Sequence, residues 1–170
     1  MTPRRLTPDE AAAVLASATP IPSGREPARS VRTTLVGEDP RGRSQRATLD
    51  RPTLVLFLST TCDGCADLAE LVRRGADGIA VLGVLRRPAH GLPDDDVDTF
   101  VGSGGAWLCG DDPFEALDVR AGPYFCLVDA AGDVVVEGVA FGRTHVEDHV
   151  ARARAGRSRP DATRLTPDGA

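Results

Sequence analysis

The residues best suited to chemistry are two cysteines separated by two positions, Cys62 and Cys65. The apolar run 53–59 before them predicts a strand buried on both faces, and residues 62–74 predict a helix with one apolar face. At a helix start, unpaired backbone N–H groups and the helix dipole stabilise a thiolate and lower the pKa of the thiol below about 8.5, the value for free cysteine. The motif therefore predicts disulfide exchange, in which Cys62 attacks a disulfide and Cys65 resolves the mixed disulfide.

Two other uses of the motif remain open. A structural zinc site needs four ligands, commonly in two close pairs. Cys109 and Cys126 are isolated from each other and His90 stands alone in a predicted loop, so the sequence disfavours zinc. The pair is inert if its surroundings do not activate a thiol. We predict no metal site and no cofactor beyond a redox-active Cys62–Cys65 disulfide.

The elements that position the motif alternate along the chain. The predicted strands are 53–59, 79–85, 106–109, 124–129 and 134–141, and the predicted helices are 62–74, 94–101, 113–119 and one that opens at Thr144 with a capping box completed by Glu147. The order β-α-β-α-(β-α)-β-β-α predicts an α/β fold of thioredoxin-like architecture, a mixed sheet with helices on both faces. A flavodoxin-like sheet is the competing fold, and the hairpin predicted for the last two strands counts against it.

Two segments of the sequence resemble a known family. The segment FLSTTCDGCADL (57–68) resembles the redox segment of the methylamine-utilisation thioredoxin-like proteins and of the broader TlpA-like thiol-disulfide oxidoreductases. The segment 122–150 is similar to a second part of these proteins, in which a Pro begins a strand, a D-x-x-G turn follows, and the return strand ends before a capped helix. The resemblance covers about residues 31–150 and indicates the fold and the redox class but no substrate.

The resemblance implies roles for four residues. Cys62 matches the nucleophilic cysteine and Cys65 the resolving one. Pro123 matches a cis-proline beside the active-site sulfurs, and Gly122 matches the position whose backbone binds an extended substrate chain. Because Gly122 has no side chain, we predict a smooth groove that tolerates many peptide sequences around the target cysteine.

The active-site segment also departs from the thioredoxin pattern. Asp63 and Gly64 replace a Pro-containing pair, which makes the motif more flexible and more acidic. Asp63 tunes the motif by placing a like charge beside the thiolate, against the effect of the dipole. Thr61 replaces the usual Trp, and Leu56 replaces the usual buried Asp, so that proton acceptor is missing.

Length and charge place these elements in one domain. The chain has 170 residues and a net charge of −5. We predict a short helix and linker over residues 1–30, the thioredoxin-like domain over 31–150 and a flexible tail over 151–170. Residues 31–150 contain 11 Arg and 20 acidic residues, a net charge of −9, which argues against nucleic acid as a partner. No apolar run is long enough to span a membrane, so we expect no membrane partner.

The first residues determine the predicted compartment. Arg4 and Arg5 resemble the start of a secretory signal, but Asp9 and Glu10 interrupt the apolar stretch that such a signal needs. We therefore expect a cytoplasmic protein. Structural disulfides are rare in that compartment, so the cysteines need another explanation.

The remaining cysteines and histidines have structural interpretations. Cys126 is predicted to be a small core residue, and a disulfide between Cys109 and Cys126 is disfavoured if they lie on separate strands. His145 and His149 are four residues apart and could share a metal ion. Because no third ligand is nearby, an exposed helix face is the preferred interpretation.

The sequence thus predicts a thiol-disulfide oxidoreductase that reduces protein or small-molecule disulfides with electrons from an unidentified donor. A peroxiredoxin-like thiol peroxidase based on Cys62 is the alternative among enzymes, although Ser59 replaces the Thr usual in such enzymes. A non-enzymatic binding domain on the same fold is the other alternative, because a fold does not determine a function.

Overall fold

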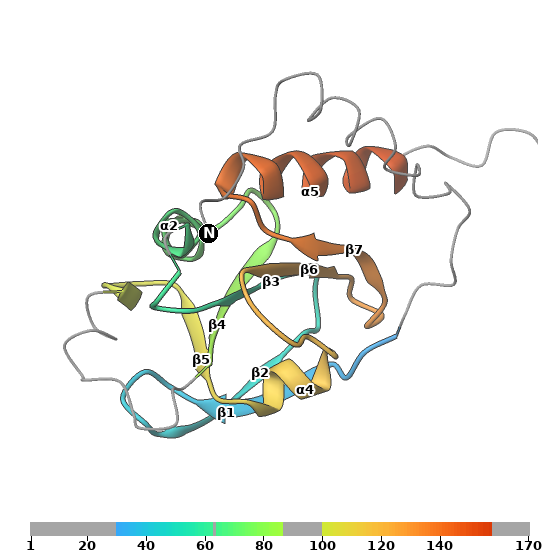
Figure 1. Ribbon diagram of the computed structural model, residues 1–170. Helices are drawn as coiled ribbons and strands as arrows, with labels where there is room; N and C mark the ends of the chain where they lie inside the picture. Colours follow the sequence, from blue (N-terminus) through green and yellow to red (C-terminus); the bar gives the residue numbers. More distant parts are fainter. Residues whose placement is uncertain (1–29, 63, 87–99, 158–170) are drawn as a thin grey trace, which may run out of the picture.

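A mixed sheet of seven strands forms the frame of the part of the chain that the computed structural model describes, residues 30–62, 64–86 and 100–157 (Figure 1). The strand order is β2-β1-β5-β4-β3-β6-β7. The elements in chain order are β1 (Thr34–Glu38), β2 (Ser44–Thr48), β3 (Thr53–Leu58), α2 (Cys65–Arg74), β4 (Ala80–Leu85), β5 (Ala106–Cys109), α4 (Asp112–Ala116), β6 (Tyr124–Val128), β7 (Val134–Val139) and α5 (Arg143–Arg157).

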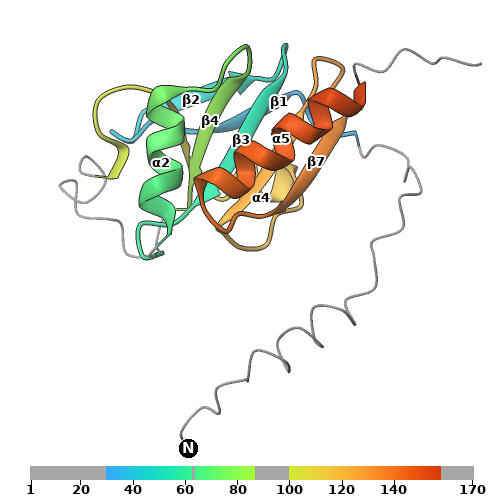
Figure 2. The same ribbon diagram turned by 90° about the horizontal axis from the view of Figure 1, so that it is seen from above.

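The central strand β3 is buried over its whole length because it has a core on each face. Leu54, Leu56 and Leu58 point into a core that α2 and α5 cover, whereas Val55 and Phe57 point into a core that includes residues of α4. Figure 2 shows α2 and α5 over the same face of the sheet. Full burial of such a side chain stabilises the fold by about 1.5–3 kcal/mol.

The pairing of the strands confirms the predicted fold class. β3 pairs with β4 in parallel and β4 with β5 in parallel, so the first part of the sheet is built from parallel crossovers. β6 pairs antiparallel with both β3 and β7. The antiparallel hairpin predicted for the last two strands is therefore present, and the flavodoxin-like alternative is excluded.

Polar contacts fasten the end of α2. Glu70 forms ion pairs with Arg73 (2.7 Å) and Arg74 (2.5 Å), and the hydrogen bonds from these two guanidinium groups lower the pKa of the Glu70 carboxyl. Arg73 also donates a hydrogen bond to the carbonyl oxygen of Phe100 (2.8 Å). This contact joins the helix to the segment that leads into β5.

One hairpin of the sheet was not predicted. β1 and β2 pair antiparallel over five residues each, and β1 joins the sheet beside β5. The sequence of β2, SQRAT, is polar, and no residue of that strand is fully buried. Such a strand lacks the apolar alternation that makes a half-buried strand visible in a sequence.

The last helix differs from the prediction at both ends. It begins at Arg143, and the Val146 amide donates to the Gly142 carbonyl (3.3 Å), so Thr144 lies inside the helix and the predicted capping box is wrong. The helix continues to Arg157, past the predicted end of the domain at residue 150. Most of the helix predicted over residues 94–101 lies outside the described residues.

Candidate active site

The Cys-x-x-Cys motif lies where β3 ends and α2 begins. Cys62 and Cys65 are joined in a disulfide, with their Cα atoms 5.4 Å apart. The Cys62 amide donates to the Ser59 carbonyl (3.3 Å), and the Cys65 amide donates to the Cys62 carbonyl (3.1 Å). Two successive backbone turns therefore hold the first cysteine beside the first turn of the helix.

The two sulfurs belong to residues with different surroundings. The predicted helix start at residue 62 is wrong, because Cys65 is the first helical residue and Cys62 precedes the helix. Cys65 is fully buried in the core that also contains Leu56 and Leu68. Cys62 is half-buried, so it is the cysteine of the pair that an incoming disulfide can reach.

Two hydroxyl groups line the turn before Cys62. The hydroxyls of Ser59 and Thr61 share a hydrogen bond (2.9 Å), and the Thr61 amide donates to the Ser59 hydroxyl (3.3 Å). Ser59 therefore shapes the turn, a role that its short side chain allows and that sequence analysis missed. The turn is polar where thioredoxins have a Trp.

The structure describes only one of the two residues between the cysteines. Asp63 lies outside the described residues, so its predicted effect on the thiolate remains a prediction. Gly64 is the exposed N-cap of α2, with φ −91° and no side-chain cap. A Cβ at Gly64 would meet no atom within 4 Å, so no close contact requires glycine there.

A second loop approaches the motif from the start of β6. The Gly122–Pro123 peptide bond is cis, as the resemblance implied. Tyr124, the first residue of β6, pairs with Phe57 of β3. Because Phe57 lies near the end of the strand that leads into Cys62, the Pro123 loop flanks that end of β3.

Close packing against β3 explains the glycine at position 122. A Cβ at Gly122 would lie 2.6 Å from the carbonyl oxygen of Phe57 and 3.2 Å from its carbonyl carbon. Real Cβ atoms do not approach a backbone that closely. The missing side chain therefore lets the loop touch β3. The smooth groove expected from this glycine stays a prediction.

An exposed aromatic residue lies next to this loop. The amide of Ala140, just after β7, donates to the Pro123 carbonyl (3.0 Å), which fixes the end of β7 against the proline. The next residue, Phe141, is 79% exposed, and Val139 is 48% exposed and pairs with Tyr124. Sequence analysis had placed Phe141 inside a strand and missed its exposure, because an apolar residue at a strand end usually belongs to the core.

The cysteines outside the motif do not take part in it. Cys109 and Cys126 are buried outside the Cys62–Cys65 disulfide and belong to the cores on opposite faces of the sheet. The predicted core position of Cys126 is confirmed. The two residues lie on separate strands, β5 and β6, which is the condition under which a disulfide between them was disfavoured.

The exposed helix face predicted for the two histidines of α5 is wrong. His145 and His149 are half-buried, and their ring centroids lie 6.1 Å and 5.7 Å from that of Phe125. Within the described part of the chain, no group of three or more His, Cys, Asp or Glu side chains could hold a metal ion. His90 and the acidic run 94–96 lie outside that part.

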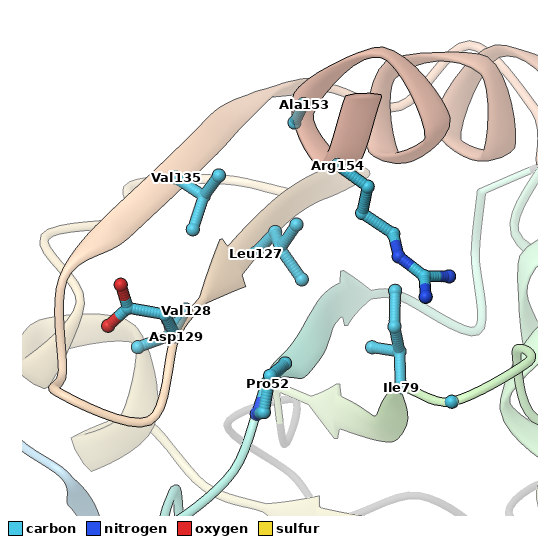
Figure 3. A pocket seen from close by; sticks show the side chains of 9 residues that line it. Pro52, Ile79, Leu127, Val128, Asp129, Val135, Ala153 and Arg154 are labelled. Carbon is cyan, nitrogen blue, oxygen red and sulfur yellow. The ribbon is translucent and has the colours of Figure 1, made fainter. Parts of the chain in front are cut away.

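A cavity of about 200 Å³ lies at the other end of the sheet (Figure 3). Its walls include Pro52, Ile79, Leu127, Val135 and Arg154. Pro52 precedes β3, whereas Cys62 follows it, and six strand residues span about 20 Å. The cavity is therefore separate from the motif.

Among the described residues, no helix is long and apolar enough to cross a membrane.

No protein-family model matches the sequence, and no curated protein sequence matches it significantly. Solved structures do resemble it. The thioredoxin domain of a thiol-disulfide oxidoreductase from Bacteroides vulgatus has a TM-score of 0.56 and 19% sequence identity, and the match covers 74% of this chain and 96% of that one. A secreted Mycobacterium tuberculosis disulfide oxidoreductase homologous to E. coli DsbE has a TM-score of 0.52 and 15% identity, with 69% and 94% of the two chains covered.

A third similar structure is an exposed lipoprotein thioredoxin from Streptococcus pneumoniae, with a TM-score of 0.54, 18% identity, and 72% and 98% of the two chains covered. The structural neighbours are thus disulfide oxidoreductases of the DsbE, TlpA-like and thioredoxin type. At these identities the likeness establishes the thioredoxin-like fold, which agrees with the sheet described above.

Proposed function

We propose that the protein is a thiol-disulfide oxidoreductase that uses Cys62 and Cys65 to reduce disulfides in proteins or small molecules. The observation that carries this proposal is the Cys62–Cys65 disulfide between β3 and the first turn of α2. The half-buried Cys62 and the buried Cys65 suit the two different steps of disulfide exchange. The names of the similar structures support the same class of reaction.

The reaction needs two exchange steps. In the dithiol form, the Cys62 thiolate attacks one sulfur of the substrate disulfide, that disulfide breaks, and the other substrate sulfur leaves as a thiolate that takes up a proton. The Cys65 thiolate then attacks the Cys62 sulfur, which forms the Cys62–Cys65 disulfide and releases the second substrate thiol. The substrate has gained two electrons and two protons, and an unidentified thiol donor must return both to the pair.

The position of the loop that contains Gly122 and Pro123 supports a binding site for the substrate chain. Its contact with Phe57 puts the backbone of this loop beside the end of β3. In the proposed complex, an extended substrate segment pairs with that backbone while its cysteine reaches Cys62.

Reduction of insulin disulfides by the protein, coupled to a chemical or enzymatic thiol donor, tests the proposal directly. We expect turnover with insulin and no consumption of hydrogen peroxide above the rate of free cysteine. Peroxide consumption that survives loss of Cys65 would favour the thiol peroxidase. Activity in neither assay, with the pair correctly oxidised and reduced, would favour a binding domain.

The direction of electron flow is part of the proposal and has its own measurement. A reductant has a potential near that of thioredoxin, about −270 mV, whereas a strong oxidant such as DsbA has a potential of about −120 mV. Equilibration of the pair with glutathione and dithiothreitol buffers therefore distinguishes the two directions. We expect a value at the reducing end, which is also the value that suits a cytoplasmic protein.

Asp63→Asn should make Cys62 more reactive. The substitution removes a negative charge next in the chain to the thiolate, so the thiolate becomes easier to form. The pH at which iodoacetamide labelling of Cys62 is half-maximal should shift downward, and the disulfide should become more oxidising. Asp67→Asn is the matched control, because Asp67 lies in the first turn of α2 but outside the motif. An upward shift for Asp63→Asn would contradict the charge argument.

Phe141→Ser should weaken the use of protein substrates. An exposed aromatic ring next to the Pro123 loop offers an apolar contact to a bound chain, and loss of such a contact typically raises KM by about fivefold or more, equal to about 1 kcal/mol. We expect this rise with insulin and no change with a small disulfide such as hydroxyethyl disulfide. Val36→Ser is the control, because Val36 is 41% exposed on the distant strand β1. Equal effects on both substrates would contradict a role in chain binding.

A further inference from the structure

Two histidine rings on α5 face one another at a distance suited to a shared ligand. His145 and His149 are one helical turn apart, so their side chains lie on the same face of α5. Their ring centroids are 4.5 Å apart, with an angle of 56° between the ring planes. The rings are therefore neighbours that are not stacked flat on each other.

Aromatic side chains hold both rings in place. Phe125 of β6 contacts the two rings from the sheet, with centroid distances of 6.1 Å to His145 and 5.7 Å to His149. Phe141 meets His145 edge-on at 5.2 Å. Gly138 of β7 pairs with Phe125, and the Phe125 ring lies against its backbone. The histidines are thus oriented by packing before any ligand binds, which lowers the entropic cost of binding one.

One nitrogen of the pair has no partner. The Nδ1 atom of His145 is buried and forms no hydrogen bond. A buried polar atom without a partner typically costs about 1–3 kcal/mol, so an ion bound to this nitrogen would remove a cost that the fold now carries.

We propose that His145 and His149 together bind one divalent ion of the late first transition row, with Cu²⁺ held more tightly than Ni²⁺ or Zn²⁺. Imidazole is a preferred ligand of all three ions, and the affinity of a nitrogen site for divalent ions is greatest for Cu²⁺. Two histidines four residues apart on one helix face are an established way to present two nitrogens to one ion. Water completes the coordination. The nearby carboxylates of Glu147 and Asp148 are paired with Arg143 and Arg152, so the two imidazoles carry the binding.

The proposed ligands lie on α5 and the active cysteines lie on the β3–α2 connection, so the proposal does not rest on the redox reaction. His145 does pack against Phe141, to which we assign a contact with protein substrates. The test therefore uses the full chain with the Cys62–Cys65 disulfide formed, so that these sulfurs are not thiolate ligands. Cys109 and Cys126 are buried, which keeps them from the added ion. Calorimetric titration with Ni²⁺, which does not oxidise thiols, should give one ion per chain, and Cu²⁺ should give one ion with higher affinity.

Substitutions identify the ligands. Loss of an outer-shell partner alone typically weakens metal binding by about 10- to 100-fold, so loss of a ligand should weaken it by at least about tenfold. We expect this for His145→Gln and for His149→Gln, and complete loss in the double variant. The chain has three histidines, so His90→Gln is a matched control that should leave binding unchanged. Unchanged binding in the double variant, or loss in His90→Gln, would overturn the proposal.

A measurement on the unaltered protein guards against variants that fail to fold. The electron paramagnetic resonance spectrum of the one-to-one Cu²⁺ complex should show nitrogen couplings from two imidazoles. Couplings from one imidazole or none would overturn the proposal, whatever the variants do. Reduction of hydroxyethyl disulfide by the double variant should match that of the unaltered protein, because this small substrate does not use the Phe141 contact. A failed metal site and a failed redox function are therefore distinguishable.

Discussion

Cys62→Ser should reduce insulin turnover to the uncatalysed rate, and Cys65→Ser should stop the reaction halfway. The first variant lacks the half-buried sulfur that an incoming disulfide can reach. The second still attacks, but the buried residue at position 65 can no longer release the product. A tagged Cys65→Ser protein should therefore accumulate substrates in mixed disulfides at Cys62. Non-reducing gels and mass spectrometry of the trapped species measure this.

The other two cysteines provide matched controls for this result. Cys126→Ala should retain turnover, because its thiol lies in the core across the sheet from the face that contains Cys65. Cys109→Ala should retain turnover as well, since Cys109 forms no disulfide. Mild oxidation of the unaltered protein should lower the count of free thiols from four to two. A count that stays at four under oxidant, or a stoichiometric zinc ion bound to the motif, would contradict the redox function.

The parts of the fold that the sequence predicted are those with strong apolar patterns. β3 and β4 are runs of apolar residues because a central strand meets a core on each face, and such runs are visible without any other information. The Cys-x-x-Cys motif was placed correctly because the strand before it and the helix after it were both visible. The β1–β2 hairpin was not predicted, because β2 is polar and lies at the edge of the sheet.

The parts of the site that the sequence could not predict depend on contacts between distant segments. The bond from the Ala140 amide to the Pro123 carbonyl brings Phe141 beside the loop, and nothing in the local sequence indicates that contact. The packing of His145 on Phe125 has the same origin, because it joins a helix to a strand 20 positions earlier. The exposed helix face predicted for the histidines rested on their four-residue spacing and on the lack of a third ligand nearby. Neither indicates which residues of the sheet pack against that face of the helix.

The close packing of Gly122 could not be predicted from the sequence. Its role in substrate binding stays a prediction, but a Cβ at this position would point at the backbone of β3. Gly122→Ala should therefore act on stability as well as on activity. The added methyl group would lie 2.6 Å from the Phe57 carbonyl oxygen, and a backbone atom cannot move aside as a flexible side chain can. Forcing an extra carbon into a packed site typically costs about 1–3 kcal/mol, which urea unfolding measures as a lower midpoint at an unchanged slope.

Activity should fall by more than the loss of stability explains, because the clash displaces the loop from the strand end that leads into Cys62. This is measured as a lower kcat/KM for insulin at a temperature where the variant is fully folded. Gly138→Ala is the matched control, since its Cβ would meet the Phe125 ring at an ordinary 3.5 Å. Alanine in a strand also loses less conformational entropy on folding than glycine does, so this control should be neutral or slightly stabilising. Equal stabilities for the two variants would mean that the loop moves freely against β3 and that Gly122 is not fixed by packing.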